Sequence, residues 1–273
     1  GKIKSTNYSF VAPDIAAIWQ KYPAPALNAQ LASRLPKDAR VIAIGFGSMN
    51  KDLGKEMMER SGMKGMLDSL RNQIPFDLSL LSSSFKNEMM MAVINTPIKN
   101  EDTDEEIPES RSMLAGMDFI IAIPIADKAK FDQLRSSINQ LVDSMKKEGK
   151  GEKIFGSMRP GIRYNNDLFV FTMHEKTADD FINNSGTSTI PAWLSEFGTQ
   201  SMIMSVDMKE LMTMVLGSKK GGTRILGVEE QSLVNMFDKV IFTGGRLENG
   251  SMRSTAEFRF SNANENAMVQ VFG

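Results

Sequence analysis

Apolar and polar positions along the chain predict strands that lead directly into helices. Three times an apolar run ends in a short polar cap and continues as an amphipathic helical pattern. The three stretches are VIAIGFGSMNKDL from residue 41, FIIAIPIADKAKF from residue 119 and MIMSVDMKELMTM from residue 202. An apolar run followed by a capping residue is typical of a buried strand that feeds a helix. We interpret the three stretches as an internal repeat.

The rest of the pattern adds further strands and helices around this repeat. Residues 161–175 predict a hairpin with its turn at 165–167, and 240–247 with 252–260 predict another around Asn249-Gly250. Further strands are expected over 86–94 and 267–272. Helices are expected over 15–21 with Asp14 as cap, 26–34, 50–60, 64–73, 127–149, 177–183 with Thr177 as cap, 207–216 and 228–237.

These elements predict an α+β fold with a mixed, largely antiparallel sheet, helices packed on one face, and quasi-repeated strand–helix–helix–strand units. We expect an N-terminal lobe over residues 1–105 and a C-terminal lobe over 106–273 that ends in a β-meander, and the two lobes can also pack as one domain. The acidic stretch at 100–110 reads as a mobile loop. It lacks the central glycine of a calcium-binding loop.

The glycines at 45 and 47 raise the question of a phosphate-binding loop. A dinucleotide fingerprint requires glycine three positions after Gly47, where this chain has Asn50. A P-loop requires Ser or Thr after its lysine, but Lys55 is followed by Glu56. The two other strand-to-helix turns contain no glycine. We therefore expect a strand end packed closely against a helix, and no nucleotide or other cofactor.

Composition narrows the classes of partner. The chain has 273 residues, 41% of them hydrophobic and 24% charged, which is typical of a globular protein. Its 32 basic and 33 acidic residues leave no basic excess, so we expect no nucleic-acid partner. The absence of cysteine excludes disulfides, thiolate catalysis and zinc–thiolate sites.

Methionine is unusually frequent, with 21 residues in the chain. The unbranched thioether fills irregular gaps in a core, which is the simplest interpretation. Two alternatives stay open: a Cu(I) site on soft sulfur ligands, and a deformable apolar groove for a ligand or partner. Met204, Met208 and Met212 are the candidates for that groove.

Catalytic patterns are sparse. His174 is the one histidine, and the chain contains no H-E-x-x-H or G-x-S-x-G motif. Asp118, Asp127 and Asp207 lie beside predicted strands, and the last two fit helix N-caps. A pair of carboxylates acting on a glycosidic bond remains the alternative. Trp19 and Trp193 lie near prolines, where we expect them to join segments by apolar contact, with stacking on a sugar or peptide as the alternative.

Several stretches resemble an uncharacterised family of Bacteroidetes cell-envelope lipoproteins, over roughly residues 30–273. LASRLPKDARVIAIGFGSMNKDL is similar to that family's helix–strand–cap–helix segment, and FIIAIPIADKAKFDQL to its strand followed by Asp-Lys. YNNDLFVFTMHEK resembles its hairpin, MIMSVDMKELMTM its Val-Asp turn, and FSNANENAMVQVF its closing strand. The glycine turn, the methionine content and the acidic loop depart from the family's pattern. The family has no known activity, so the resemblance implies no functional residue.

What the resemblance does imply is an exported, lipid-anchored precursor facing the periplasm or the cell surface. The chain itself starts at Gly1 without a signal-peptide pattern. We therefore predict a non-catalytic envelope-associated binding or structural module, with an unknown protein, peptide or glycan partner and membrane contact only through the anchor. The alternatives are a carboxylate hydrolase of glycan or peptide and a methionine-lined pocket for an apolar ligand.

Overall fold

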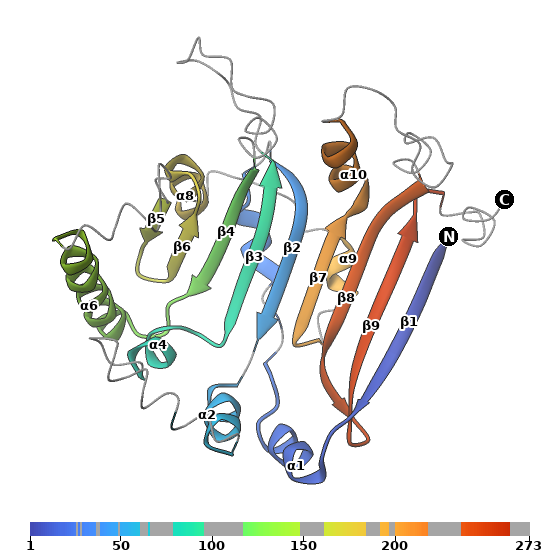
Figure 1. Ribbon diagram of the computed structural model, residues 1–273, viewed down its shortest axis with the longest axis horizontal. Helices are drawn as coiled ribbons and strands as arrows, with labels where there is room; N and C mark the ends of the chain where they lie inside the picture. The colour runs from blue at the N-terminus through green and yellow to red at the C-terminus, as the bar shows by residue number, and fades with distance from the viewer. Residues whose placement is uncertain are drawn as a thin grey trace.

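One nine-stranded antiparallel sheet runs through the computed structural model, in the order β1-β9-β8-β7-β2-β3-β4-β6-β5 (Figure 1). The structure describes residues 1–25, 27, 29–36, 39–48, 50–60, 65, 79–95, 117–147, 161–183, 192–196, 200–217 and 236–262. The strands are β1 (Lys2–Phe10), β2 (Arg40–Ser48), β3 (Glu88–Asn95), β4 (Met117–Pro124), β5 (Gly161–Tyr164), β6 (Leu168–Thr172), β7 (Met202–Asp207), β8 (Phe237–Glu248) and β9 (Ser251–Phe260). The predicted α+β class with a largely antiparallel sheet is confirmed.

The helices lie at the ends of the strands and on the faces of the sheet. They are α1 (Pro13–Lys21), η1 (Ala29–Arg34, a 3₁₀ helix), α2 (Lys51–Arg60), α4 (Ser79–Ser84), α6 (Lys128–Lys147), α8 (Glu175–Ile182), α9 (Ala192–Ser195) and α10 (Met208–Gly217). None of the helices in the described part of the chain is both long enough and apolar enough to span a bilayer.

The core lies between one face of the sheet and the helices η1, α8 and α9. Alternate residues of a strand point to the same face, and in the central strands the inward set is buried. In β3 these are Met90, Ala92 and Ile94, which pack with Phe181 of α8 and Leu194 of α9. In Figure 1, η1 and α9 lie behind the sheet, so the reader sees the opposite face.

At one corner a helix also packs on that opposite face. Phe169 of β6 points away from the core, because its neighbour Val170 points into it. The ring of Phe169 lies 5.9 Å from that of Phe131 on α6 and 5.8 Å from that of Phe85, which follows α4. This aromatic cluster covers the corner formed by β5 and β6. The helices η1, α8 and α9 therefore share the core face, as predicted, whereas α6 and the end of α4 pack on the opposite face at this corner.

Each of the three predicted strand-to-helix turns is present, as β2 to α2, β4 to α6 and β7 to α10. Asp127 accepts the N–H of Lys130 at 3.1 Å, and Asp207 accepts the N–H of Glu210 at 2.9 Å. Both aspartates are the helix caps that the sequence predicted. That the three units are copies of one repeat stays a prediction.

Four predicted elements lie outside the described residues. They are the helix at 64–73, nearly all of the helix at 228–237, the loop at 100–110 and the strand at 267–272.

Several local predictions were wrong. Residues 2–10 were not recognised as a strand, yet they form β1. The expected α-helix at 26–34 is the 3₁₀ helix η1, which starts at Ala29. Asp14 lies inside the first turn of α1, whose N-cap is Ala12. Thr177 likewise lies inside α8. That helix begins at Glu175 with His174 as its N-cap, because β6 runs directly into it.

The predicted hairpins β5–β6 and β8–β9 are present, and glycine contributes to the special geometry of the second. Asn249 and Gly250 both have positive φ, of 49° and 76°, as a two-residue hairpin turn between β8 and β9 requires. Gly245, with φ 80°, lies at an irregularity in the pairing of β8 with β9.

The two expected lobes share one sheet. The strands β2 and β3 of the expected N-terminal lobe lie between β7 and β4 of the expected C-terminal lobe.

Replacing glycine by alanine is expected to destabilise the protein at position 161 and to have little effect at position 47. A Cβ on Gly161 would lie 2.6 Å from Thr172 Oγ1 and 2.8 Å from the backbone at His174 and Glu175. A Cβ on Gly47 would meet only Met89 Cγ, at 3.8 Å. We expect Gly161→Ala to lower the free energy of unfolding by about 2–3 kcal/mol, because backbone cannot move aside cheaply. The matched variant Gly47→Ala should change it by less than about 1 kcal/mol. Urea denaturation of both variants measures this, and equal losses would contradict the packing described.

Candidate functional site

The face of the sheet opposite the core carries rows of mostly apolar residues, each of which crosses several strands. Residues directly paired between antiparallel strands lie side by side on one face. The first row is Ile162, Phe171, Ile121, Met91, Gly45, Met204, Phe242 and Ala256. The second is Phe119, Val93, Ala43, Val206, Val240, Phe258 and Ile3. The third is Met89, Gly47, Met202 and Gly244. We call these three rows the open sheet face.

Much of the open sheet face is exposed to solvent. Met202 is 52% exposed, Met204 43%, Met91 42% and Phe242 36%. Ile162, Phe258 and Ile3 are exposed as well. Single apolar residues are common on protein surfaces, but several that adjoin one another across strands mark an interaction surface.

The glycines of β2 belong to this face and answer the question of a phosphate loop. Phe46 between them points into the core, so Gly45 and Gly47 point outward. A Cβ on Gly45 would lie 3.8 Å from Met204 Cγ, so the methionine packs beside the glycine backbone. Both glycines lie within β2 and pair with β3 and β7. Their amides serve the sheet. The expected close approach of a helix is wrong at these positions, because the atoms nearest to a Cβ at Gly45 or Gly47 belong to the neighbouring strands β7 and β3.

The three candidate groove methionines do not share one surface element. Met204 lies on the open sheet face, while Met208 and Met212 are half-buried on α10. Neither of the two leading cavities among the described residues is lined by them. Sequence reasoning missed Met89, Met91 and Met202 as partners of Met204. Their spacing of two within each strand was the available signal, but only the β3–β2–β7 order places them together.

A cavity of about 340 Å³ lies on the core side, where β2, β7 and β8 meet α9 and α10. Its lining combines the indole of Trp193 and an apolar floor with charged groups. The charged residues are Arg40, Asp207, Glu210 and Lys239. Arg40 and Glu210 are 3.7 Å apart, and Lys239 is 3.6 Å from Asp238. Arg40, Glu210 and Lys239 therefore already face opposite charges of the chain, and Asp207 accepts the backbone N–H of Glu210. Trp19 lies apart, half-buried in α1.

Asp118 and His174 meet where β6 passes into α8. Asp118 is 1% exposed, and its Oδ1 accepts the N–H of Met173 at 2.6 Å. Its Oδ2 lies 3.2 Å from His174 Nδ1 but accepts no well-aligned hydrogen bond from the described residues. The imidazole is half exposed. The pairing of His174 with Asp118 was not foreseen, because the two residues are 56 positions apart in the sequence.

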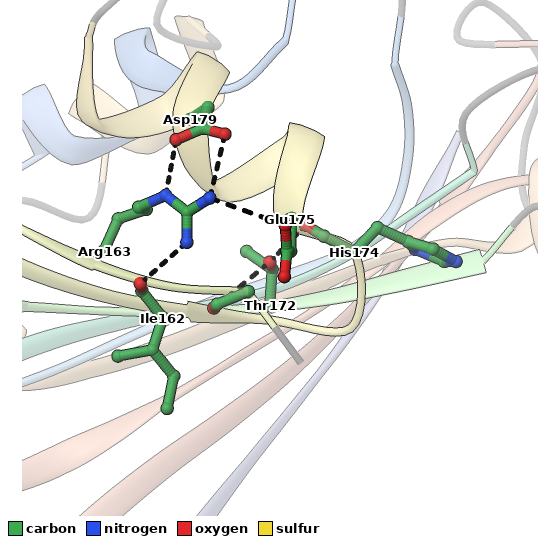
Figure 2. Close-up of polar contacts among 7 residues, drawn as sticks. Ile162, Arg163, Thr172, His174, Glu175 and Asp179 are labelled. Atoms are coloured by element: carbon green, nitrogen blue, oxygen red, sulfur yellow. Dashed lines mark hydrogen bonds and ion pairs between the residues drawn. The ribbon is translucent and has the colours of Figure 1, made fainter. Parts of the chain in front are cut away.

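At the same junction, Arg163 connects β5 to α8 (Figure 2). Its guanidinium donates to both carboxylate oxygens of Asp179 on α8, at 2.5 and 3.1 Å, and lies 3.7 Å from Glu175. These hydrogen bonds hold the pKa of Asp179 below its usual value. Thr172 donates to the carbonyl of His174 at 2.6 Å. The His174 ring points away from this cluster in Figure 2.

The groups that hydrogen-bond around His174 are backbone groups, the buried carboxylate of Asp118 and the hydroxyl of Thr172. Together they fix the start of α8. Within the described side chains, no three His, Asp or Glu residues gather as metal ligands. The contacts favour a structural role for Asp118.

Replacing Asp118 tests that role. Asp118→Ala leaves the Met173 N–H buried without its acceptor, so we expect a loss of about 2–4 kcal/mol in the free energy of unfolding. Asp118→Asn keeps one acceptor oxygen and should lose about half as much. Asp14→Asn, at an exposed position in the first turn of α1, is the control, with a loss below about 1 kcal/mol. Chemical denaturation provides the values. If Asp118→Ala is as stable as the control, the carboxylate does not hold this junction.

Comparison with protein-family models, with curated proteins and with solved structures finds no match to this chain. The resemblance to envelope lipoproteins therefore stays a prediction. Function has to be argued from the surfaces described above.

Proposed function

We propose that the chain is a non-catalytic binding module whose open sheet face takes up an apolar surface of a partner protein. The observation that carries this proposal is the exposure of Met91, Met202, Met204 and Phe242 in adjoining rows. Removing apolar surface from water is favourable by roughly 25 cal/mol per Å². A face of this kind therefore gains free energy when a partner covers it.

The side chains of this face suit a protein partner. None of the residues in the three rows is charged or carries a hydrogen-bonding side chain, and the first row meets a polar side chain only at the β1 edge, where Ser5 pairs with Ala256. This composition disfavours glycans, peptides that bind through charge, and nucleic acid, all of which need polar contacts. Methionine and phenylalanine are enriched at protein–protein interfaces, and methionine adapts to surfaces of different shape. An isolated acyl chain is expected to prefer an enclosed cavity, and no methionine of the open face lines either leading cavity among the described residues.

The contacts within the chain make hydrolysis by carboxylates the weaker alternative. Asp207 and Glu210 line the same cavity, as a carboxylate pair would. Asp207, however, accepts the N–H of Glu210, and Glu210 faces Arg40. Both acids thus have structural partners. A place at the cell envelope rests on the family resemblance alone and is part of this proposal.

The open sheet face should bind an apolar probe. We expect Met202→Lys/Met204→Lys to reduce the fluorescence enhancement of the dye ANS several-fold, because two charges would interrupt adjoining apolar rows. The thermal midpoint should change by only a few degrees, since both side chains are exposed. Leu81→Lys/Ile138→Lys replaces two exposed apolar residues on α4 and α6 and serves as the matched control.

The partner itself is detected by a photo-cross-linking residue at position 204, compared with one at exposed Lys176 on α8. In cells expressing the chain, position 204 should give a discrete protein adduct that Met202→Lys abolishes. Equal dye binding by the face variant and its control, together with the same adducts from positions 204 and 176, would refute the proposal.

A further inference from the structure

β1 forms an edge of the sheet and is exposed on both of its sides. All nine of its residues are exposed, and its pairing partner among the described strands is β9. The pairing is continuous from Lys2↔Arg259 to Phe10↔Ser251, without a register shift. Tyr8 is 61% exposed and Phe10 81%. A long, regular strand of this kind presents a row of backbone groups to any second strand.

The hydrogen bonds at the two ends of β1 show which backbone groups point outward. The N–H of Phe260 donates to the carbonyl of Gly1, and the N–H of Val11 donates to the carbonyl of Gly250. In an antiparallel pair, hydrogen-bonded positions alternate along the strand. The odd-numbered residues of β1 therefore bond to β9. The N–H and C=O groups of the even-numbered residues point away from the sheet. These are Lys2, Lys4, Thr6, Tyr8 and Phe10.

The opposite edge of the sheet is protected, whereas β9 is the one described strand that pairs with β1. β5 has four residues, and its Arg163 is held by Asp179 of α8. Short length and a neighbouring helix are common ways to block an edge. β1 contains no proline and no bulge. The charged residues of β1 are Lys2 and Lys4. They would repel a second strand that placed a positive charge opposite them, and only in that case would they protect the edge.

A second copy of β1 avoids that repulsion. In an antiparallel pairing centred on Thr6, Lys2 lies opposite Phe10 and Lys4 opposite Tyr8 of the other copy. Lysine over an aromatic ring is an attractive pair, and no like charges face each other. The same register pairs even-numbered residues with even-numbered residues. Every outward N–H and C=O of β1 then finds a partner. Both the backbone and the side chains of this strand are thus complementary to themselves.

We infer that β1 is a homodimer interface, at which two copies of the chain join their sheets through an antiparallel β1–β1 pair centred on Thr6. Paired residues in such a pair point to the same side, so the two-fold axis is perpendicular to the sheet. The two open sheet faces then lie on the same side of one continuous sheet. This inference rests on the edge strand alone and holds whether or not the open face binds a partner.

Substitution by proline tests the pairing on the full chain. Thr6→Pro removes an outward N–H without removing a bond to β9, so it should convert a dimer to a monomer while the thermal midpoint stays near that of the wild type. Met202→Lys/Met204→Lys should remain dimeric. Analytical ultracentrifugation at micromolar concentration measures both. A monomeric wild-type chain, or a dimer that dissociates on the methionine change and persists with Thr6→Pro, would overturn the inference.

Cross-linking gives a second readout if Thr6→Pro fails to fold. The chain contains no cysteine, so a single introduced thiol reports one position. Thr6→Cys places two thiols across the two-fold axis within about one strand spacing, and a short thiol cross-linker should yield covalent dimer. Lys4→Cys is the matched control, because its copies would lie roughly 13 Å apart along the strands. Equal yields from the two variants would exclude the Thr6-centred register.

Discussion

The alternation of side chains across one hydrogen-bonded antiparallel sheet is the constraint on which the rest of the structure depends. In β3, Met90, Ala92 and Ile94 enter the core, while Met89, Met91 and Val93 must point the other way. The helices η1, α8 and α9 cover the first set. The second set meets the outward residues of β2 and β7, and together they produce an apolar face. A one-residue slip of any strand would exchange the two sets.

The same constraint explains why glycine and methionine occur together. At Gly45 and Gly47 the strand β2 has no outward side chain, and methionines of β3 and β7 pack beside the bare backbone at these two positions. A glycine-rich stretch after an apolar run suggests a phosphate loop when it is considered alone. Placed in the middle of the sheet, it instead separates two methionine-bearing strands. The chemistry of the site is thus the chemistry of adaptable apolar contact.

Several features that depend on residues close together in the sequence were predicted correctly. The caps at Asp127 and Asp207, the Asn249-Gly250 turn and the strand before each helix depend on residues close in the chain. The strand β1 was missed because KIKSTNYSF lacks apolar alternation, and its stability comes from pairing with β9, about 250 residues later. The open sheet face and the Asp118–His174 contact were missed for the same reason. Each depends on strand order, which no local pattern encodes.

Oxidation of individual methionines by dilute peroxide, followed by mass spectrometry, tests the central claim most directly. Met90 and Met91 are neighbours in one strand, yet Met90 is 0% exposed and Met91 42%. If the sheet has one buried and one open face, Met91, Met202 and Met204 oxidise many times faster than Met90 in the native protein. If Met91 and Met202 are as protected as Met90, the face is covered and the account fails.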